Sequence, residues 1–174
     1  MKKFELTNEF ITNMFGTKLF RIRALVEFGD VEAGELGGYV EKESNLGHDD
    51  NAWVYDNAWV YGDAQVSGDA LVYGNARVYG NAWVYGDARV CGNGDYAYAH
   101  GFGSVNRTMT FFRLKDGGVG VRCGCFYGTL AQFRDKIRET HGESAIAEEY
   151  LDLAALMEKR FRRTGNEQKT EEES

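Results

Sequence analysis

The chain has 174 residues, of which 43% are hydrophobic, and this length and composition are typical of a compact globular protein. The net charge of −7, without a basic stripe, argues against direct nucleic-acid binding. No apolar run approaches the roughly 20 residues of a membrane-spanning helix, the start MKKFELTNEF lacks the apolar core of a signal peptide, and three cysteines, an odd number, favour reduced thiols in the cytoplasm.

Residues 1–37 are predicted to form an N-terminal cap. Residues 3–6 and 18–28 have the alternating pattern of strands. Gly34, Gly37 and Gly38 then mark a bend before the pattern changes. The open end of a repeat array exposes unpaired backbone groups and apolar side chains, so a cap is needed there.

An acidic block follows, because residues 29–50 carry a net charge of −6. One interpretation is a solvated rim that keeps the start of the repeats soluble. The other is a negative surface that meets a basic partner. The acidic patch consists of Asp30, Glu32, Glu35, Glu41, Glu43, Asp49 and Asp50.

Residues 51–92 are seven uninterrupted copies of a six-residue unit, NAWVYD, NAWVYG, DAQVSG, DALVYG, NARVYG, NAWVYG and DARVCG. Ala and Val lie two positions apart, so an extended chain points both to one face. Gly and Asn/Asp between the strands tolerate the positive φ of a sharp corner. Three strands return the chain to its start, which predicts that residues eighteen apart, such as Val54, Val72 and Val90, stack in interior columns. Including degenerate strands in residues 38–50, the repeat region is 38–92.

The residues on either side of each Val point outward and are largely aromatic. One interpretation is that the stacked rings only stiffen the sheets. The other is that at least one face is buried, in a homo-oligomer or on a partner, because Tyr, Trp and Arg dominate interface energies. The candidate interaction residues, richest on the second face and at the Trp53 edge of the first, are Trp53, Tyr55, Trp59, Tyr61, Tyr73, Arg77, Tyr79, Trp83 and Tyr85.

After Gly92 the period ends. Residues 93–104 are glycine- and aromatic-rich and are predicted to be a linker loop. Residues 105–163 are predicted to form a ββαα subdomain, with a hairpin about Asp116 and a first helix capped by Thr129 and Gln132. Residues 164–174 are predicted to be a disordered acidic tail.

The Val-to-Ala spacing of four, as from Val54 to Ala58, resembles the hexapeptide repeat of left-handed parallel β-helix proteins. The resemblance implies a mainly β fold, a left-handed parallel β-helix of about three coils with an N-terminal β cap and a C-terminal ββαα subdomain. The lead-in RIRALVEFGDVEAGELGGYVEKESNL, the hexads, and TFFRLKDGGVGVRCGCFYGTL with THGE and EYLDL also resemble small proteins of phages and prophages. The lead-in and early hexads are similar to bacterial proteins labelled as hexapeptide-repeat transferases.

Catalysis would need a histidine base, since hexapeptide acyltransferases use one between neighbouring subunits. His48 lies in the degenerate early coil, and His100, just after the last hexad, is the best candidate. No hexad is interrupted by a loop that could cover a substrate, so we expect no catalytic residue and no cofactor. Cys123, Cys125 and His141 lack the paired spacing of structural zinc sites, so we expect no metal.

The resemblance to phage proteins implies a phage accessory protein in the cytosol of a host cell, and the absence of a convincing catalytic pattern favours a non-enzymatic one. We expect it to bind and inhibit or redirect a host protein through its aromatic and acidic faces, as anti-defence proteins such as anti-CRISPRs do. The expected partners are a host protein and further copies of the chain, without nucleic acid or membrane. Two alternatives stay open: an acyltransferase-like enzyme and a self-assembling structural protein.

Overall fold

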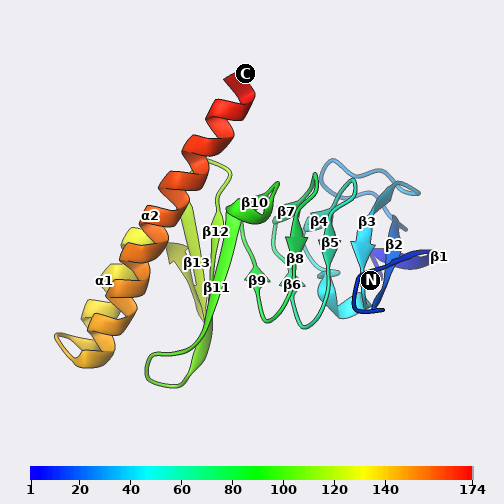
Figure 1. Ribbon diagram of the computed structural model, residues 1–174. Helices are drawn as coiled ribbons and strands as arrows, with labels where there is room; N and C mark the ends of the chain where they lie inside the picture. Colours follow the sequence, from blue (N-terminus) through cyan, green and yellow to red (C-terminus); the bar gives the residue numbers. More distant parts are fainter. Residues whose placement is uncertain (174) are drawn as a thin grey trace. The chain divides into compact units, whose positions relative to one another are not determined.

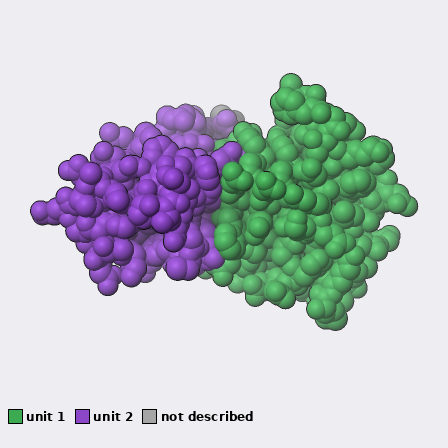
Figure 2. Space-filling model, turned by 90° about the horizontal axis from the view of Figure 1, so that it is seen from below, with its two compact units in different colours: residues 1–93 green, residues 94–174 purple. Residues whose placement is uncertain are grey.

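The computed structural model describes residues 1–173. The chain divides into two compact units, Met1–Asn93 and Gly94–Ser174 (Figure 2). The fold is mainly β, with two helices near the C-terminal end of the chain (Figure 1). Within residues 1–173, no helix combines the length and apolar character needed to cross a membrane.

The N-terminal cap is a hairpin whose sheet continues into the repeats. Strands β1 (Phe4–Thr12) and β2 (Lys18–Ala24) pair antiparallel, and β2 pairs antiparallel with β3 (Leu36–Val40). Strand β3 then pairs in parallel with β5 of the repeats, in the register Tyr39↔Trp59. The cap therefore covers a sheet edge that would otherwise be unpaired.

Seven two-residue strands make the repeat region, one in each hexad. They are β4 (Trp53–Val54), β5 (Trp59–Val60), β6 (Gln65–Val66), β7 (Leu71–Val72), β8 (Arg77–Val78), β9 (Trp83–Val84) and β10 (Arg89–Val90). Each pairs in parallel with the strand eighteen residues along, which gives the sheets β4-β7-β10, β5-β8 and β6-β9. The predicted eighteen-residue stacking is confirmed.

The interior of the repeats is made by the Val and Ala of every hexad, none of which is more than 1% exposed. Glycines at the corners have positive φ, whereas Asp56 takes this conformation (φ 53°) in the first hexad. At Gly68 a side chain is excluded, because a Cβ there would lie 2.7 Å from the backbone nitrogen of Gly86 in the next coil. Corner composition therefore follows from backbone conformation and close stacking.

At the start of the repeats, carbonyl groups of the first coil have no preceding strand to donate a hydrogen bond to them. Two side chains donate these hydrogen bonds instead. Lys3 is 3% exposed, and its Nζ donates to the carbonyl oxygen of Ala52 at 2.8 Å. Burial lowers the pKa of Lys3 to about 8. The buried amide of Asn45 donates to the carbonyl oxygen of Ala64 at 2.8 Å. Both side chains satisfy backbone carbonyl groups that would otherwise lack a hydrogen bond at the end of the β array.

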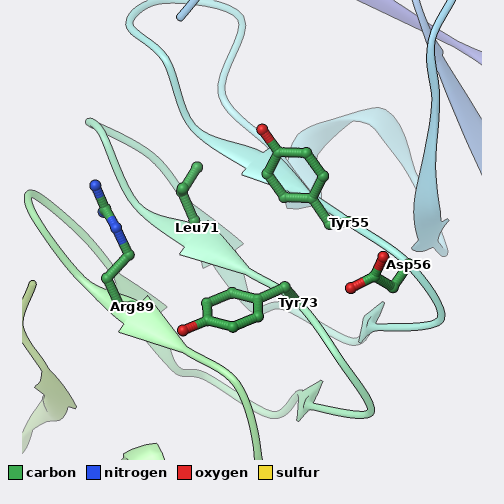
Figure 3. A pocket seen from close by; sticks show the side chains of 5 residues that line it. All are labelled: Tyr55, Asp56, Leu71, Tyr73 and Arg89. Carbon is green, nitrogen blue, oxygen red and sulfur yellow. The ribbon is translucent and has the colours of Figure 1, made fainter. Parts of the chain in front are cut away.

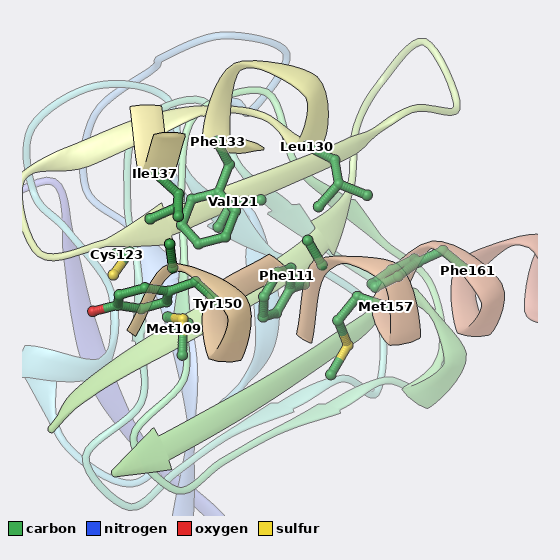
Figure 4. Close-up of a cluster of buried hydrophobic side chains, with 12 residues drawn as sticks. Met109, Phe111, Val121, Cys123, Leu130, Phe133, Ile137, Tyr150, Met157 and Phe161 are labelled. Atoms are coloured by element: carbon green, nitrogen blue, oxygen red, sulfur yellow. The ribbon is translucent and has the colours of Figure 1, made fainter. Parts of the chain in front are cut away.

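The second unit is a four-stranded antiparallel sheet with both helices on one face (Figure 1). Its elements are β11 (Tyr96–Phe102), β12 (Arg107–Arg113), β13 (Val119–Cys123), β14 (Phe126–Thr129), α1 (Leu130–His141) and α2 (Ala145–Glu173). Buried side chains such as Met109, Phe133 and Phe161 fill the space between sheet and helices (Figure 4). The capping box at Thr129 and Gln132 is present as predicted.

The prediction of a linker loop over 93–104 was wrong. After a short 3-10 turn at Asn93–Asp95, residues Tyr96–Phe102 form β11, which pairs with β12. The alternation of Tyr and Ala over 96–99 places Ala97 and Ala99 against the helices. A fourth strand, β14, also precedes α1, so the second unit is ββββαα and not ββαα.

The prediction of a disordered tail over 164–174 was also wrong where the structure describes it, and Ser174 lies outside the described residues. Helix α2 continues through Gly165 to Glu173. Arg113 donates to the Phe161 carbonyl oxygen at 2.9 Å and to Asp95 at 3.2 Å, and Gln168 donates to the same carboxylate at 2.8 Å. These contacts hold the helix beyond the glycine.

Candidate binding surfaces

The nine residues predicted to interact do not gather on one surface. The strand pairing places Trp53, Tyr55 and Tyr73 on the β4-β7-β10 face, which we call the first face. Trp59, Tyr61, Arg77 and Tyr79 belong to the β5-β8 face, the second face, and Trp83 and Tyr85 to the β6-β9 face, the third face. The candidate surface must therefore be judged one face at a time.

Trp53 is not part of any interaction surface, contrary to the prediction. It is 0% exposed, and its ring packs edge-on against Phe28 at 5.2 Å and Phe4 at 6.3 Å between centroids. Among residues 1–173, its Nε1 has no hydrogen-bond partner. Trp53 occupies the same hexad position as Trp59, but the cap covers it, so it anchors the cap to the first coil.

The second face carries a row of two aromatic rings with an arginine at each end, and this row crosses four strands of the sheet β1-β2-β3-β5-β8. Arg77 lies over the Trp59 ring at 4.0 Å, and Arg21 lies over the Tyr39 ring at 5.2 Å. The registers Arg21↔Tyr39, Tyr39↔Trp59 and Trp59↔Arg77 put these four residues in one line. We call this line the Arg-aromatic row.

A second line of rings runs beside the Arg-aromatic row. Tyr61 and Tyr79 stack with 5.3 Å between centroids and an interplanar angle of 16°. Tyr79 is 43% exposed, the largest exposure of an aromatic ring in the repeats. The side chains of the second face thus hold one another in place, which reduces the entropy lost when a partner binds.

The first face contains a shallow hollow of about 400 Å³ (Figure 3). Tyr55, Leu71, Tyr73 and Arg89 line it, and Asp56 stands at its edge, where its carboxylate accepts from the Gly74 backbone at 3.1 Å. We call it the first-face hollow. Its floor and walls are apolar and aromatic, and its edge carries both signs of charge.

The acidic patch is divided by the structure. Glu41 accepts from the Gly62 backbone at 2.6 Å within the repeat region, and Glu43 pairs with Lys2 of the cap. Burial raises the pKa of Tyr55, and the negative charges of Glu35 and Asp30 raise it further, so these two carboxylates act on the first-face hollow. Asp49 and Asp50 act on the buried Lys3. Glu32 lies with Asp30 in the exposed loop before β3.

The histidines are held in local packing. His48 stacks on Phe4 at 4.4 Å and its Nδ1 accepts from the Lys3 backbone at 3.1 Å, while burial lowers its pKa. His100 lies in strand β11 rather than in a loop, with Nδ1 2.7 Å from the Thr108 hydroxyl. His141 stacks on Tyr150 at 5.6 Å.

The cysteines have different environments. Cys123 is buried, which raises the pKa of its thiol, whereas Cys91 and Cys125 are exposed. Among residues 1–173, no group of three or more His, Cys, Asp and Glu side chains is placed to hold a metal ion.

Four residues of interest were not predicted from the sequence. Leu71 and Arg89 were not predicted as binding residues, although the eighteen-residue stacking already placed them on the same face as Tyr55. Met14 and Phe15 also escaped notice. Two large apolar residues between Asn13 and Gly16 are a signal for an exposed turn, and these two are 90% and 82% exposed.

Parallel strands that stack at a fixed interval of eighteen residues define a β-solenoid. In agreement, a family model described as the YdcK beta solenoid repeat matches residues 52–68, 64–78, 70–86 and 76–92. The chain is therefore a β-solenoid repeat protein with a two-helix region near its C-terminal end. A comparison with curated proteins finds no match.

Proposed function

We propose that this chain is a non-enzymatic binding protein whose second face binds a partner protein. The observation that carries the proposal is the Arg-aromatic row with the stacked pair Tyr61 and Tyr79 beside it. Tyr, Trp and Arg are the residues whose truncation most often weakens protein interfaces. Rings and guanidinium groups already held by stacking bind with less loss of side-chain entropy.

The class of partner comes from the resemblance to small phage and prophage proteins. On the basis of this resemblance, we propose that the partner is a host protein. Binding would inhibit or redirect that protein. Anti-defence activity, as in anti-CRISPR proteins, is the specific form we propose. The cytosol of the host cell is the proposed location.

We also propose that the repeats wind as a left-handed parallel β-helix of about three coils. The support is the hexapeptide spacing, in which Val54 is followed by the small Ala58 and the pattern continues to Val84 and Ala88. An experimental crystal structure would decide the handedness, since a right-handed coil would contradict the resemblance.

The binding proposal is tested with variants of two faces. Tagged wild-type protein is used to capture a partner from a bacterial host lysate, and the purified partner is then titrated. Arg77→Glu with Tyr79→Ala should weaken the affinity by at least about thirtyfold, the loss typical of one interface hot spot. Trp83→Ala with Tyr85→Ala removes two rings from the third face and should leave the affinity within about threefold. Equal affinities for all three proteins would contradict the proposal.

A further inference from the structure

The tip of the β1-β2 hairpin exposes two large apolar side chains. Met14 is 90% exposed and Phe15 is 82% exposed. The turn is held by Asn13, whose side-chain oxygen accepts from the backbone nitrogens of Phe15 and Thr17, each at 3.0 Å. The two side chains are therefore presented by a fixed turn, and we call this feature the hairpin tip.

The surroundings of the hairpin tip are apolar and basic. Phe10, near the end of β1, is 45% exposed, and the Lys18 ammonium group lies 4.6 Å from the centre of its ring. Adjacent exposed apolar side chains on a protein surface mark a site of interaction. The chain carries a net charge of −7, which disfavours an anionic membrane as the occupant.

The first-face hollow has the complementary character. Leu71 with Tyr55 and Tyr73 offers apolar and aromatic contacts, and Arg89 offers a cation for an aromatic ring. Asp56 at its edge, with Glu35 and Asp30 close enough to raise the pKa of Tyr55, places three carboxylates around the hollow against the single guanidinium group of Arg89. The volume of about 400 Å³ lies within the ~300–1,000 Å³ of ligand pockets.

We propose that the hairpin tip of one copy of this chain enters the first-face hollow of a second copy. Phe15 and Met14 pack against Leu71 and the tyrosine rings, while Lys18 faces the acidic edge of the hollow. Because the two surfaces differ, the contact is heterologous: in a pair, the copy that inserts its tip keeps a free hollow, and the other copy keeps a free tip. The second face takes no part, so this assembly is independent of the partner binding proposed above.

The test uses two variants that disable one surface each. Met14→Ser with Phe15→Ser blunts the tip. Leu71→Arg blocks the hollow, at a repeat position that already holds Arg in the hexads of Arg77 and Arg89. Leu156→Ser removes a 58% exposed leucine elsewhere, and Gln65→Arg adds the same charge on the third face, so these are the controls.

Sedimentation measures the result. We expect wild type and both controls to self-associate, more weakly at high salt, and each disabled variant alone to associate at least about thirtyfold more weakly. An equal mixture of the two disabled variants should form dimers that grow no further, because only one intact tip and one intact hollow meet. Circular dichroism spectra like that of wild type show that the variants fold.

Three outcomes would overturn the proposal. The first is a wild-type protein that stays monomeric at concentrations up to about 1 mM. This outcome includes a monomer whose hairpin tip binds vesicles of anionic lipid. The second is assembly that neither variant weakens. The third is a mixture of the two disabled variants that stays monomeric, since tip and hollow would then not contact each other.

Discussion

In the repeat region the interior consists of the same residue types at fixed intervals, such as Val54, Val72 and Val90, whereas the core of the second unit joins unlike residues from two strands and both helices. A repeat valine has neighbours set by the eighteen-residue period. Phe133, by contrast, packs edge-on against Phe111 and Tyr150, which precede and follow it by many residues. In the regular core, outward positions accept varied residues, whereas inward positions need a small apolar side chain. The irregular core depends instead on individual contacts between residues far apart in the sequence.

The largest effect is expected in the centre of the repeats. Val72→Asp would bury a carboxylate in an interior column where Val72 is 0% exposed, at a cost of several kcal/mol. We expect loss of the cooperative unfolding transition of the repeat region in urea. Gln65→Asp places the same group on an outer face and should change the free energy of unfolding by less than about 0.5 kcal/mol. Equal tolerance of both substitutions would refute the division into inward and outward positions.

The second unit should be most sensitive at Arg113. Arg113→Ala leaves the Asp95 carboxylate, in a residue only 2% exposed, without its ion pair, and removes the bonds to the carbonyl of Phe161 and the hydroxyl of Thr164. Breaking a buried pair from one side costs about 3–5 kcal/mol. We therefore expect lower stability and faster amide exchange in residues 165–173. Arg134→Ala, which removes an ion pair at the surface, is the control and should cost less than about 1 kcal/mol. Unchanged exchange in 165–173 would show that Arg113 does not hold the end of α2.

The second face should separate stability from binding. Trp59→Ala with Tyr61→Ala removes rings that stack outside the Val columns, so the cost in stability should be about 0.2–1 kcal/mol per stacked pair. Binding of a partner should fall at least about thirtyfold. A titration run beside a thermal melt distinguishes the two, and a large fall in melting temperature with unchanged affinity would mean that the rings only stiffen the sheet.

The smallest expected effect is the pH dependence of the cap. His48 is surrounded by Lys3, Lys2, the N-terminus and Glu43, and burial is the largest cause of its lowered pKa. The unfolded chain binds this proton near pH 6.5, whereas the folded chain binds it only at lower pH. The free energy of unfolding therefore falls as the pH drops below about 6.5 and recovers above it.

His48→Gln removes that proton and should flatten this part of the stability curve relative to wild type, as measured by urea unfolding between about pH 5 and pH 7. The same unfolding series on His100→Gln measures the effect of replacing an exposed histidine outside the cap. A wild-type curve that rises toward lower pH in this range would contradict the assigned direction.

Much of the solenoid could be predicted because its contacts follow from local sequence. A six-residue unit with Ala and Val two apart sets the inward face, and three strands per coil set the interval of eighteen. The helix start at Thr129 was also predictable, since the capping box lies within four residues. Outward residues such as Tyr55 and Tyr73 were placed on the correct face for the same reason.

Only the tertiary structure determined the burial of Trp53, the length of α2 and the presence of the first-face hollow. Trp53, Trp59 and Trp83 are equivalent in the repeat, and only the cap, whose Phe28 lies twenty-five positions before Trp53, buries the first of them. Gly165 favours a helix end locally, but Arg113 and Asp95 hold α2 beyond it through contacts more than fifty residues apart. Such contacts leave no periodic trace in the sequence, because each is made once and between segments that only the folded chain brings together.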